Sequence, residues 1–228
     1  MKTIIQKLKL VIAITLVSFA AISCEKKDNL PVNNNNSNNR ADALIILSQI
    51  NAMPLEALSD AETADILYMR EEEKLERDVY TTLKLKWGAN VFVNISASEQ
   101  VHMDALLMLI QKYNLTDPVV DNTVGVFSNT SLQALYTKLV NEGSASLAAA
   151  FNVGATIEDL DIFDLHNATL NTNNQDIRFV YDNLTKGSRN HLRAFYRTIL
   201  RVGDVYTPQY IKADEFDAII TSANETGY

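Results

Sequence analysis

The chain has 228 residues, of which 28 are acidic and 20 basic, giving a formal net charge of −8 at pH 7. This acidity argues against nucleic acid as a partner, because nucleic-acid binding needs a basic surface. Hydrophobic residues make up 47% of the chain, which is enough for the core of one domain.

The N-terminus has the pattern of a lipoprotein signal peptide. Lysines at positions 2, 7 and 9 precede the uncharged stretch Leu10–Ile22, which is shorter than the about 20 apolar residues that span a bilayer. The letters AISC at positions 21–24 resemble the lipobox that lipoprotein signal peptidase cleaves. The sequence therefore predicts a signal peptide over 1–23, lipidation of Cys24 and a lipid-anchored place in the cell envelope. An ordinary signal peptide followed by a chance cysteine is the alternative.

Residues 24–57 are predicted to be a flexible tether with a short helical lead-in. The run Asn33–Asn36 lies in a stretch with almost no apolar side chain, so burial cannot offset the entropy lost on ordering it. The folded domain is expected over residues 58–212, and residues 213–228 are expected to form a polar tail.

The domain is expected to be all-α, because glycine, proline and alternating β-branched runs are scarce. Asp60 is the expected N-cap of the first helix, and Gly154 is expected to interrupt the fourth. Four long helices with modest connections predict an antiparallel four-helix bundle with a short helical insertion. The expected helices are Ala61–Leu85, Asn94–Tyr113, Ser131–Asn141, Ser144–Leu170 and Asp176–Val202.

The first long helix carries three consecutive acids, Glu71–Glu73, inside an amphipathic pattern. Three consecutive residues cover most of a helix circumference, so at least one of these carboxylates is expected to face inward. Glu73 shares a stripe with Tyr80 and is the first choice, with Glu72 as the alternative. A solvated charge run that continues through residues 74–77 is the competing interpretation.

The second long helix holds Glu99 and His102, three residues apart on a face that also carries Ile95 and Leu106. A buried glutamate costs free energy unless it is paired or bound to a cation. A Glu-x-x-His pair of this kind holds iron or manganese in helical bundles. One such motif also occurs by chance on helix surfaces, so it needs partners.

The remaining long helices supply such partners. Glu158 and Asp161 lie one turn apart on the fourth helix, and His191 lies among apolar neighbours on the last. A single histidine of this kind is more often a hydrogen-bonded core residue than a ligand. Together with the acids, however, it predicts a cofactor of one or two iron or manganese ions, because carboxylates with a few imidazoles suit these metals.

Several separated stretches resemble the DUF2202 family, whose members are ferritin-like. They are Leu67–Tyr80, Ser98–Asp104, Glu158–Ile162 and Gly187–Phe195, with shorter likenesses at Gly125–Phe127 and Pro208–Tyr210. The resemblance covers nearly all of the predicted domain. It implies a ferritin-like bundle of the rubrerythrin-like kind with a metal centre in its core.

The resemblance also implies which residues are ligands. Glu73 matches the acid of the first helix of the ferritin-like pattern, and the second-helix pair Glu99 and His102 matches its Glu-x-x-His. Glu158 matches the third-helix acid, supplemented by Asp161. His191 matches the histidine of the fourth helix.

This sequence departs from the ferritin-like pattern at Ser188, where a glutamate is expected three residues before the last histidine. The departure removes one bridging carboxylate. Asp161 could substitute for it, the second metal could bind weakly, or a single metal could bind.

Three functions are compatible with these residues. The first is a di-iron-type oxidoreductase that oxidises ferrous iron or removes peroxide, with Tyr68 or Tyr80 beside the ligands. The second is a metal-binding or sensing lipoprotein without turnover. The third is an interaction module of the cell envelope whose acids form a buried polar network. A homodimer is compatible with all three, and the redox partner stays open.

Overall fold

The computed structural model describes residues 48–226, so the predicted signal peptide, Cys24 and the asparagine-rich stretch lie outside the described residues. Residues 48–226 form helices and no strand, which confirms the predicted all-α class. No helix within this range is both long and apolar enough to cross a membrane. The helices are α2 (Asp60–Trp87), α3 (Asn90–Lys112), α4 (Thr130–Gly143), α5 (Leu147–Leu170), α6 (Gln175–Arg201) and α7 (Ala213–Thr221).

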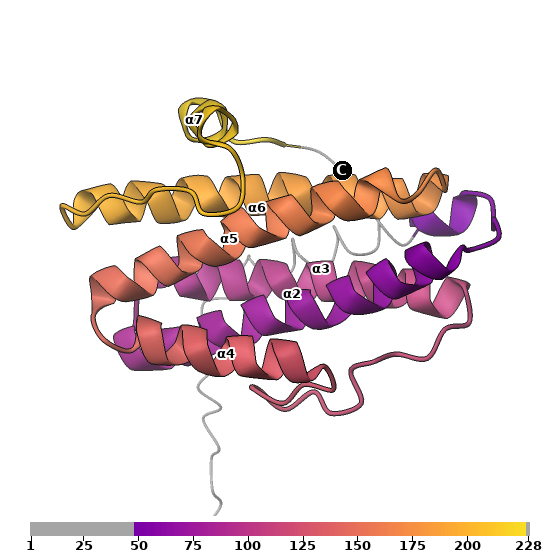
Figure 1. Ribbon diagram of the computed structural model, residues 1–228, viewed down its shortest axis with the longest axis horizontal. Coiled ribbons are helices and arrows are strands. Elements are labelled where there is room, and N and C mark those ends of the chain that lie inside the picture. Colours follow the sequence, from indigo (N-terminus) through magenta and orange to yellow (C-terminus); the bar gives the residue numbers. More distant parts are fainter. Residues whose placement is uncertain (1–47, 227–228) are drawn as a thin grey trace, which may run out of the picture. The chain divides into compact units, whose positions relative to one another are not determined.

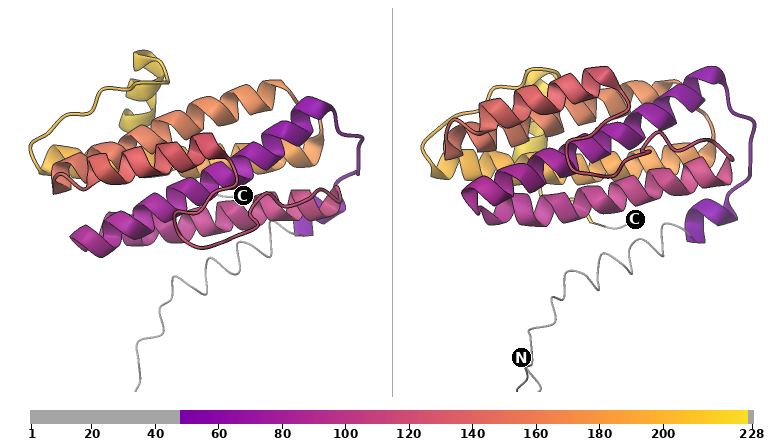
Figure 2. Two further views of the ribbon diagram at one scale, coloured as in Figure 1. Left: turned by 60° about the horizontal axis from the view of Figure 1, so that its bottom comes forward. Right: turned by 90° about the horizontal axis from the view of Figure 1, so that it is seen from below.

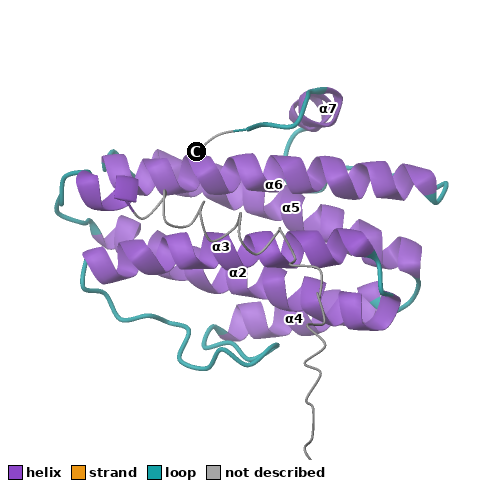
Figure 3. Cartoon of the chain, turned by 180° about the vertical axis from the view of Figure 1, so that it is seen from behind, coloured by secondary structure: helices purple, strands orange, loops and turns teal. Residues whose placement is uncertain are grey.

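Four long helices form the bundle. Helix α2 packs along α3, and α5 packs along α6, in two antiparallel hairpins (Figure 1). The hairpins meet through contacts of α2 with α5 and of α3 with α6 (Figure 2). The shorter α4 lies against α2 and α5 after a long loop from α3 (Figure 3), which matches the predicted helical insertion.

Local signals in the sequence set the ends of α2. The N-cap is Ser59 and not the predicted Asp60: the Ser59 hydroxyl accepts a hydrogen bond from the Glu62 N–H at 3.2 Å. The Glu62 carboxylate in turn accepts one from the Ser59 N–H at 2.7 Å, which completes a capping box. Gly88 ends the helix in the left-handed conformation, with φ 65°, and its N–H donates to the Lys84 carbonyl.

The predicted interruption of α5 at Gly154 is wrong, because the helix runs unbroken through it. The glycine serves packing between helices. A β-carbon at this position would lie 2.4 Å from Cε1 of Phe195 on α6. The absent side chain therefore lets the Phe195 ring lie directly against the α5 backbone.

The two ends of the predicted domain need correction. Residues 213–228 are not only a polar tail, since they include α7, whose Phe216 and Ile219 are buried. On the N-terminal side, Ile50 is fully buried, and the Lys112 ammonium donates to its carbonyl at 2.9 Å. The lead-in after residue 47 and α7 therefore both pack on the bundle.

The core is divided into two apolar halves. One half surrounds Tyr80, Phe92 and Phe195, and the other surrounds Leu106 and Tyr181. Between them, each of the four long helices carries buried polar or charged residues at the same level of the bundle. The candidate site lies in this polar layer.

Candidate metal centre

Five side chains from four helices meet in the polar layer. Helix α2 supplies Glu73, α3 supplies Glu99 and His102, α5 supplies Glu158, and α6 supplies His191. The three carboxylates are fully buried, and each histidine is only 8% exposed. They form two overlapping groups of three, each with potential ligand atoms within 4.8 Å of one another, and the groups share Glu99.

The first group joins α2 to α3. The Nδ1 atom of His102 lies 3.1 Å from Oε2 of Glu73 and 2.7 Å from Oε2 of Glu99. Because Glu99 and His102 stand one helical turn apart, α3 alone fixes their spacing. Glu73 completes the group from the neighbouring helix of the same hairpin.

The second group joins the two hairpins. The Nδ1 atom of His191 lies 2.9 Å from Oε1 of Glu99 and 3.3 Å from Oε2 of Glu158. The His102 and His191 rings are stacked, with centroids 5.6 Å apart and planes inclined by 28°. Glu99 thus presents one oxygen to each imidazole, which is the position of a bridging ligand between two ions.

Several ligand atoms of the cluster have no hydrogen-bond partner. Both oxygens of Glu99 and the Nδ1 atom of His191 are buried without one, although the two residues are in close contact. Oε1 of Glu73 and Oε2 of Glu158 are likewise unsatisfied. Buried polar atoms without partners are rare in proteins and costly. A cation bound among these atoms would relieve that cost.

The electrostatics keep the shared ligand anionic. Burial alone would raise the pKa of Glu99, but His191 and His102 hold that pKa at about 2. Burial raises the pKa of Glu158 to about 7, and His191 offsets part of the increase. Burial alone would lower the pKa of His191, whereas Glu99 and Glu158 raise it to about 10. Glu99 therefore stays ionised at neutral pH.

Tyr80 holds the Glu158 carboxylate from the apolar side. Its hydroxyl donates to Oε1 of Glu158 at 2.5 Å, which leaves Oε2 facing His191. Of the two tyrosines predicted to lie beside the ligands, Tyr80 contacts one directly. Tyr68, in contrast, is partly exposed, and burial of the rest of its side chain and the charge of Glu72 raise its pKa.

Asp161, the predicted supplementary acid, is buried but lies outside both groups. One of its oxygens accepts a short hydrogen bond from the hydroxyl of Ser188, which also contacts the Leu184 carbonyl at 2.8 Å. Ser188 occupies the position where the ferritin-like pattern has a glutamate. The Asp161–Ser188 pair therefore joins α5 to α6.

The charge run on α2 is not solvated, so the competing interpretation of this segment is wrong. Glu71, Glu72, Lys74 and Glu76 are all buried, like Glu73. The Glu71 carboxylate accepts hydrogen bonds from the N–H groups of the loop at residues 128–129. Neighbouring segments cover the whole circumference of α2 at residues 71–76. The charged sequence of this segment therefore does not mean that its side chains are exposed to solvent.

Glu72, the alternative to Glu73, faces α5 and not the histidines. Burial first, and then the charges of Asp161 and Asp164, raise its pKa well above the ordinary value. Glu76 was not singled out from the sequence, but burial and the nearby Asp161 raise its pKa in the same way. Its spacing of three from Glu73 and four from Glu72 is the signal that could have identified it.

Gly187 is a further residue that the sequence did not single out for the site. A β-carbon on it would lie 2.5 Å from Nε2 of His102. The α6 backbone therefore lies directly against the imidazole on the side away from the carboxylates. The only sequence signal is a glycine in the middle of a long amphipathic helix, where it costs stability unless packing requires it.

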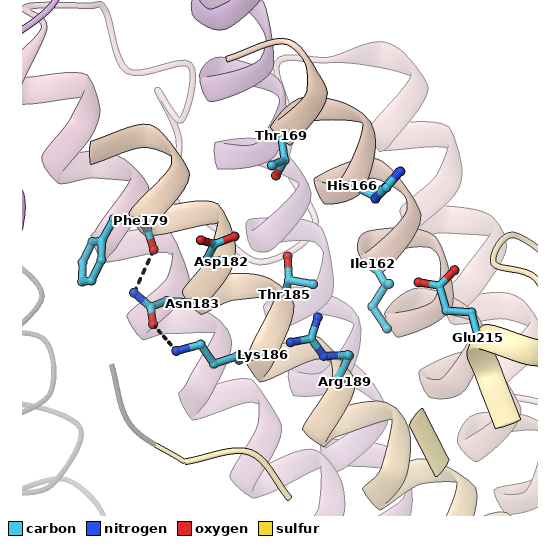
Figure 4. Close-up of a pocket in the computed structure, with 10 residues that line it drawn as sticks. All are labelled: Ile162, His166, Thr169, Phe179, Asp182, Asn183, Thr185, Lys186, Arg189 and Glu215. Carbon is cyan, nitrogen blue, oxygen red and sulfur yellow. Dashed lines mark hydrogen bonds between the residues drawn. The ribbon is translucent and has the colours of Figure 1, made fainter. Parts of the chain in front are cut away.

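A groove of about 580 Å³ lies elsewhere on the surface, between α5 and α6 (Figure 4). His166, Lys186, Arg189 and Glu215 are among its lining residues, and no member of the five-residue cluster is. Hydrogen bonds link Phe179 to the Asn183 amide and that amide to Lys186 along one wall (Figure 4). The groove is therefore separate from the candidate metal centre.

The chain is similar to known proteins over nearly all of its helical bundle. The model of a family described as "Uncharacterized protein domain (DUF2202)" matches residues 62–223, which confirms the resemblance inferred from the separate motifs. The uncharacterized protein MJ0754 of Methanocaldococcus jannaschii is 52% identical over 182 residues, which are 80% of this chain and 98% of the relative. The crystal structure of MJ0754 has a TM-score of 0.76, covering 76% of this chain and 99% of that one.

Proposed function

The chain belongs to the DUF2202 family, and we propose that it binds iron or manganese in the middle of its bundle, in the manner of ferritin-like proteins. The observation that carries this proposal is the position of Glu99. Its two oxygens are fully buried and lie 2.7 Å and 2.9 Å from the Nδ1 atoms of His102 and His191. Divalent cations bound by the two groups that share Glu99 would balance the charge of these buried carboxylates.

The donor set fits these metals. Three carboxylates and two imidazoles are hard to intermediate ligands, which suit iron and manganese. A structural zinc site would favour thiolates, and no cysteine lies within residues 48–226. One acid on α2, a Glu-x-x-His on α3, an acid on α5 and a histidine on α6 match the ligand pattern of carboxylate-bridged bundles except at Ser188, where that pattern has a glutamate.

The number of metal ions that bind depends on the residues that α6 contributes to the site. Glu73, Glu99 and His102 would hold one ion, and Glu99, Glu158 and His191 would hold a second. The second ion lacks the carboxylate that Ser188 replaces, and the Ser188 hydroxyl is engaged with Asp161. We therefore expect the first ion to bind more tightly than the second.

Bound iron would supply redox chemistry toward dioxygen or peroxide. The residues of the chain would hold the ion, exclude bulk water and fix the charge around it. Burial raises the pKa of Glu158 to about 7 in the metal-free cluster, so a cation that binds this carboxylate would compete with a proton. The missing carboxylate at Ser188 favours a second candidate, a metal-binding or sensing protein without turnover.

The test is the metal content of the purified full-length chain, measured by mass spectrometry after anaerobic loading with ferrous iron or Mn²⁺. We expect one to two ions per chain, and loss of both in Glu99→Gln. The matched control is Glu71→Gln, which also removes a buried carboxylate from this layer but one that binds backbone N–H groups. Equal metal in wild type and Glu99→Gln would contradict the proposal.

Oxygen and peroxide consumption by the loaded protein separates the two candidates. Turnover that disappears in Glu99→Gln would support the oxidoreductase, whereas stoichiometric metal without turnover would support the binding protein. Metal-free wild type that folds identically in EDTA would leave the interaction module as the remaining hypothesis.

The proposal includes the lipid anchor. It rests on the uncharged stretch Leu10–Ile22 and on the single cysteine that follows it, Cys24. Acyl chains would hold the metal-binding domain at a membrane of the cell envelope. The test is the mass and membrane partition of the expressed chain beside Cys24→Ser. A wild type without an acyl mass increment would contradict this part alone.

A further inference from the structure

A row of acids between α2 and α5 belongs to neither ligand group. It consists of Glu72 and Glu76 on α2 and of Asp161 and Asp164 on α5, and we call it the acid file. The residues on α2 are four apart and those on α5 are three apart, so each pair lies on one face of its helix. Because α2 and α5 are antiparallel (Figure 1), the two rows run along each other.

The acid file runs from the surface to the ligand cluster. At its outer end, Asp164 is half-buried and the neighbouring Tyr68 is 37% exposed. Further in, Glu72 is 2% exposed, and Asp161 and Glu76 are 1% exposed. One turn beyond Asp161, the same face of α5 presents the fully buried ligand Glu158. From Tyr68 to Glu76 the distance along α2 is about 12 Å.

The inner carboxylates of the acid file lack hydrogen-bond donors. Both oxygens of Glu76 and Oδ1 of Asp161 are buried without a partner, and Glu72 meets another carboxyl group, that of Asp164. The basic residues of α2 at this level are engaged elsewhere: Lys74 pairs with Asp78 at 2.6 Å, and Arg77 pairs with the same carboxylate at 2.8 Å. Buried carboxylates without donors or counter-charges are costly, and a cation would relieve that cost.

We propose that the acid file is the route by which a divalent cation enters the buried cluster. The inference rests on the proposed function, because a route has meaning only if the cluster binds metal. Carboxylate oxygens are suited to passing such ions, since hard divalent cations prefer oxygen ligands. The carboxylates of the file are spread along α2 and α5 and not gathered about one point, which favours transit over permanent binding.

The groove of Figure 4 is a poorer entrance, because its lining carries charges of both signs. Its wall on α6 carries Lys186 and Arg189 beside Asp182, so an approaching cation meets positive as well as negative charge there. The Arg189 guanidinium is also held by the Glu225 carboxylate at 2.7 Å and does not face the cluster. The four members of the acid file, by contrast, are all carboxyl groups, and none of them is basic.

The experiment measures the rate at which Co²⁺ alone reaches the cluster of the full-length chain. Stopped-flow mixing follows the visible absorption that Co²⁺ acquires when imidazole enters its coordination. The variants are Glu72→Gln at the inner part of the file and Asp164→Asn at its mouth, and the control is Glu71→Gln. Circular dichroism checks folding, and Asp164→Asn tests the route even if Glu72→Gln does not fold, because Asp164 is half-buried.

We expect both file variants to slow loading roughly tenfold or more, the scale of electrostatic focusing, with the final absorption unchanged. Glu71→Gln should load at the wild-type rate. Wild-type rates in both file variants would overturn the route, and so would reduced final absorption at an unchanged rate, which would make these acids ligands. Wild type that binds no Co²⁺ would instead refute the proposed function, and the route with it.

Discussion

The imidazole of His102 lies directly against the α-carbon of Gly187, so closely that a β-carbon on the glycine would stand 2.5 Å from Nε2. The contact joins α3 to α6 and presses the opposite ring atom, Nδ1, toward Glu73 and Glu99. The position of the His102 ring therefore depends on the lack of a side chain at Gly187 as well as on the two glutamates.

Gly187→Ala should displace the His102 ring and lower the affinity for metal about 10–100-fold, the usual effect of disturbing a group that orients a ligand. The measurement is metal content at limiting Mn²⁺. Normally, glycine to alanine inside a helix stabilises by about 0.5–1 kcal/mol.

The control for this prediction is the same change in a His102→Ala background. There the added methyl group no longer meets the ring, so Gly187→Ala should raise the melting temperature. If the substitution had the same effect with and without His102, the proposed positioning role of Gly187 would be wrong.

Tyr80→Phe should weaken the second ligand group. The change removes the hydroxyl that holds Glu158 at 2.5 Å and leaves a buried carboxylate oxygen unsatisfied. We expect the free energy of unfolding to fall by about 1–3 kcal/mol in urea denaturation. The ratio of bound metal per chain should fall toward one, because the first group does not include Glu158.

Tyr113→Phe is the matched control, since its hydroxyl also binds a buried carboxylate, that of Asp176 at 2.8 Å, but away from the cluster. Lys112 still pairs with Asp176 at 2.6 Å after the change. Metal content should therefore stay at the wild-type value. An equal loss of metal in both variants would mean that general destabilisation, and not the hold on Glu158, explains the effect.

Lys74→Met should be strongly destabilising. The Lys74 ammonium is fully buried and donates to Asp78 at 2.6 Å and to the Thr123 carbonyl at 2.9 Å. Removing one partner of a buried ion pair costs about 3–5 kcal/mol, and we expect the lower end because Arg77 still pairs with Asp78. Urea denaturation measures the change.

Lys138→Met is the control for Lys74→Met. Its ion pair with Glu142 is exposed and 4.0 Å long, so its loss should alter stability by no more than about 0.5 kcal/mol. A similar small effect at Lys74 would show that the buried pair contributes little net stability.

The sequence predicted the parts of the molecule that follow helical periodicity. Helix class and order, and five of the six residues named as ligands, depend on which positions share a helix face, and these five meet in the structure. Asp161 is the exception, because its contact with Ser188 depends on how α5 lies against α6. A spacing rule within one helix carries no information on such contacts between helices.

The charged segment of α2 shows a second limit of sequence interpretation. Glu76 and Lys74 are buried because α3, α5 and the loop before α4 cover the helix on all sides, which composition alone does not indicate. The same holds for residues 213–221, where two apolar residues, Phe216 and Ile219, suffice to attach a short helix to the bundle. In both segments, contacts with the rest of the fold determine which side chains are buried.

The C-terminal attachment should be sensitive to acid. The Glu225 carboxylate accepts hydrogen bonds from Arg189 at 2.7 Å and from Arg193 at 2.9 Å, and these guanidinium groups lower its pKa to about 2. An unfolded glutamate has a pKa of about 4.3. Because the folded pKa is the lower one, the contact contributes its full stability above about pH 4.3 and loses it as the pH falls toward 2.

Glu225→Gln tests this expectation through thermal melts between pH 7 and pH 2. The variant should be less stable than wild type at pH 7 by no more than about 1 kcal/mol, because the pair is partly exposed. The difference should shrink below pH 4.3 and be small near pH 2, where about half of the folded Glu225 carboxyl is protonated. A difference that stays constant across this range would mean that the contact acts through packing and not through the carboxylate charge.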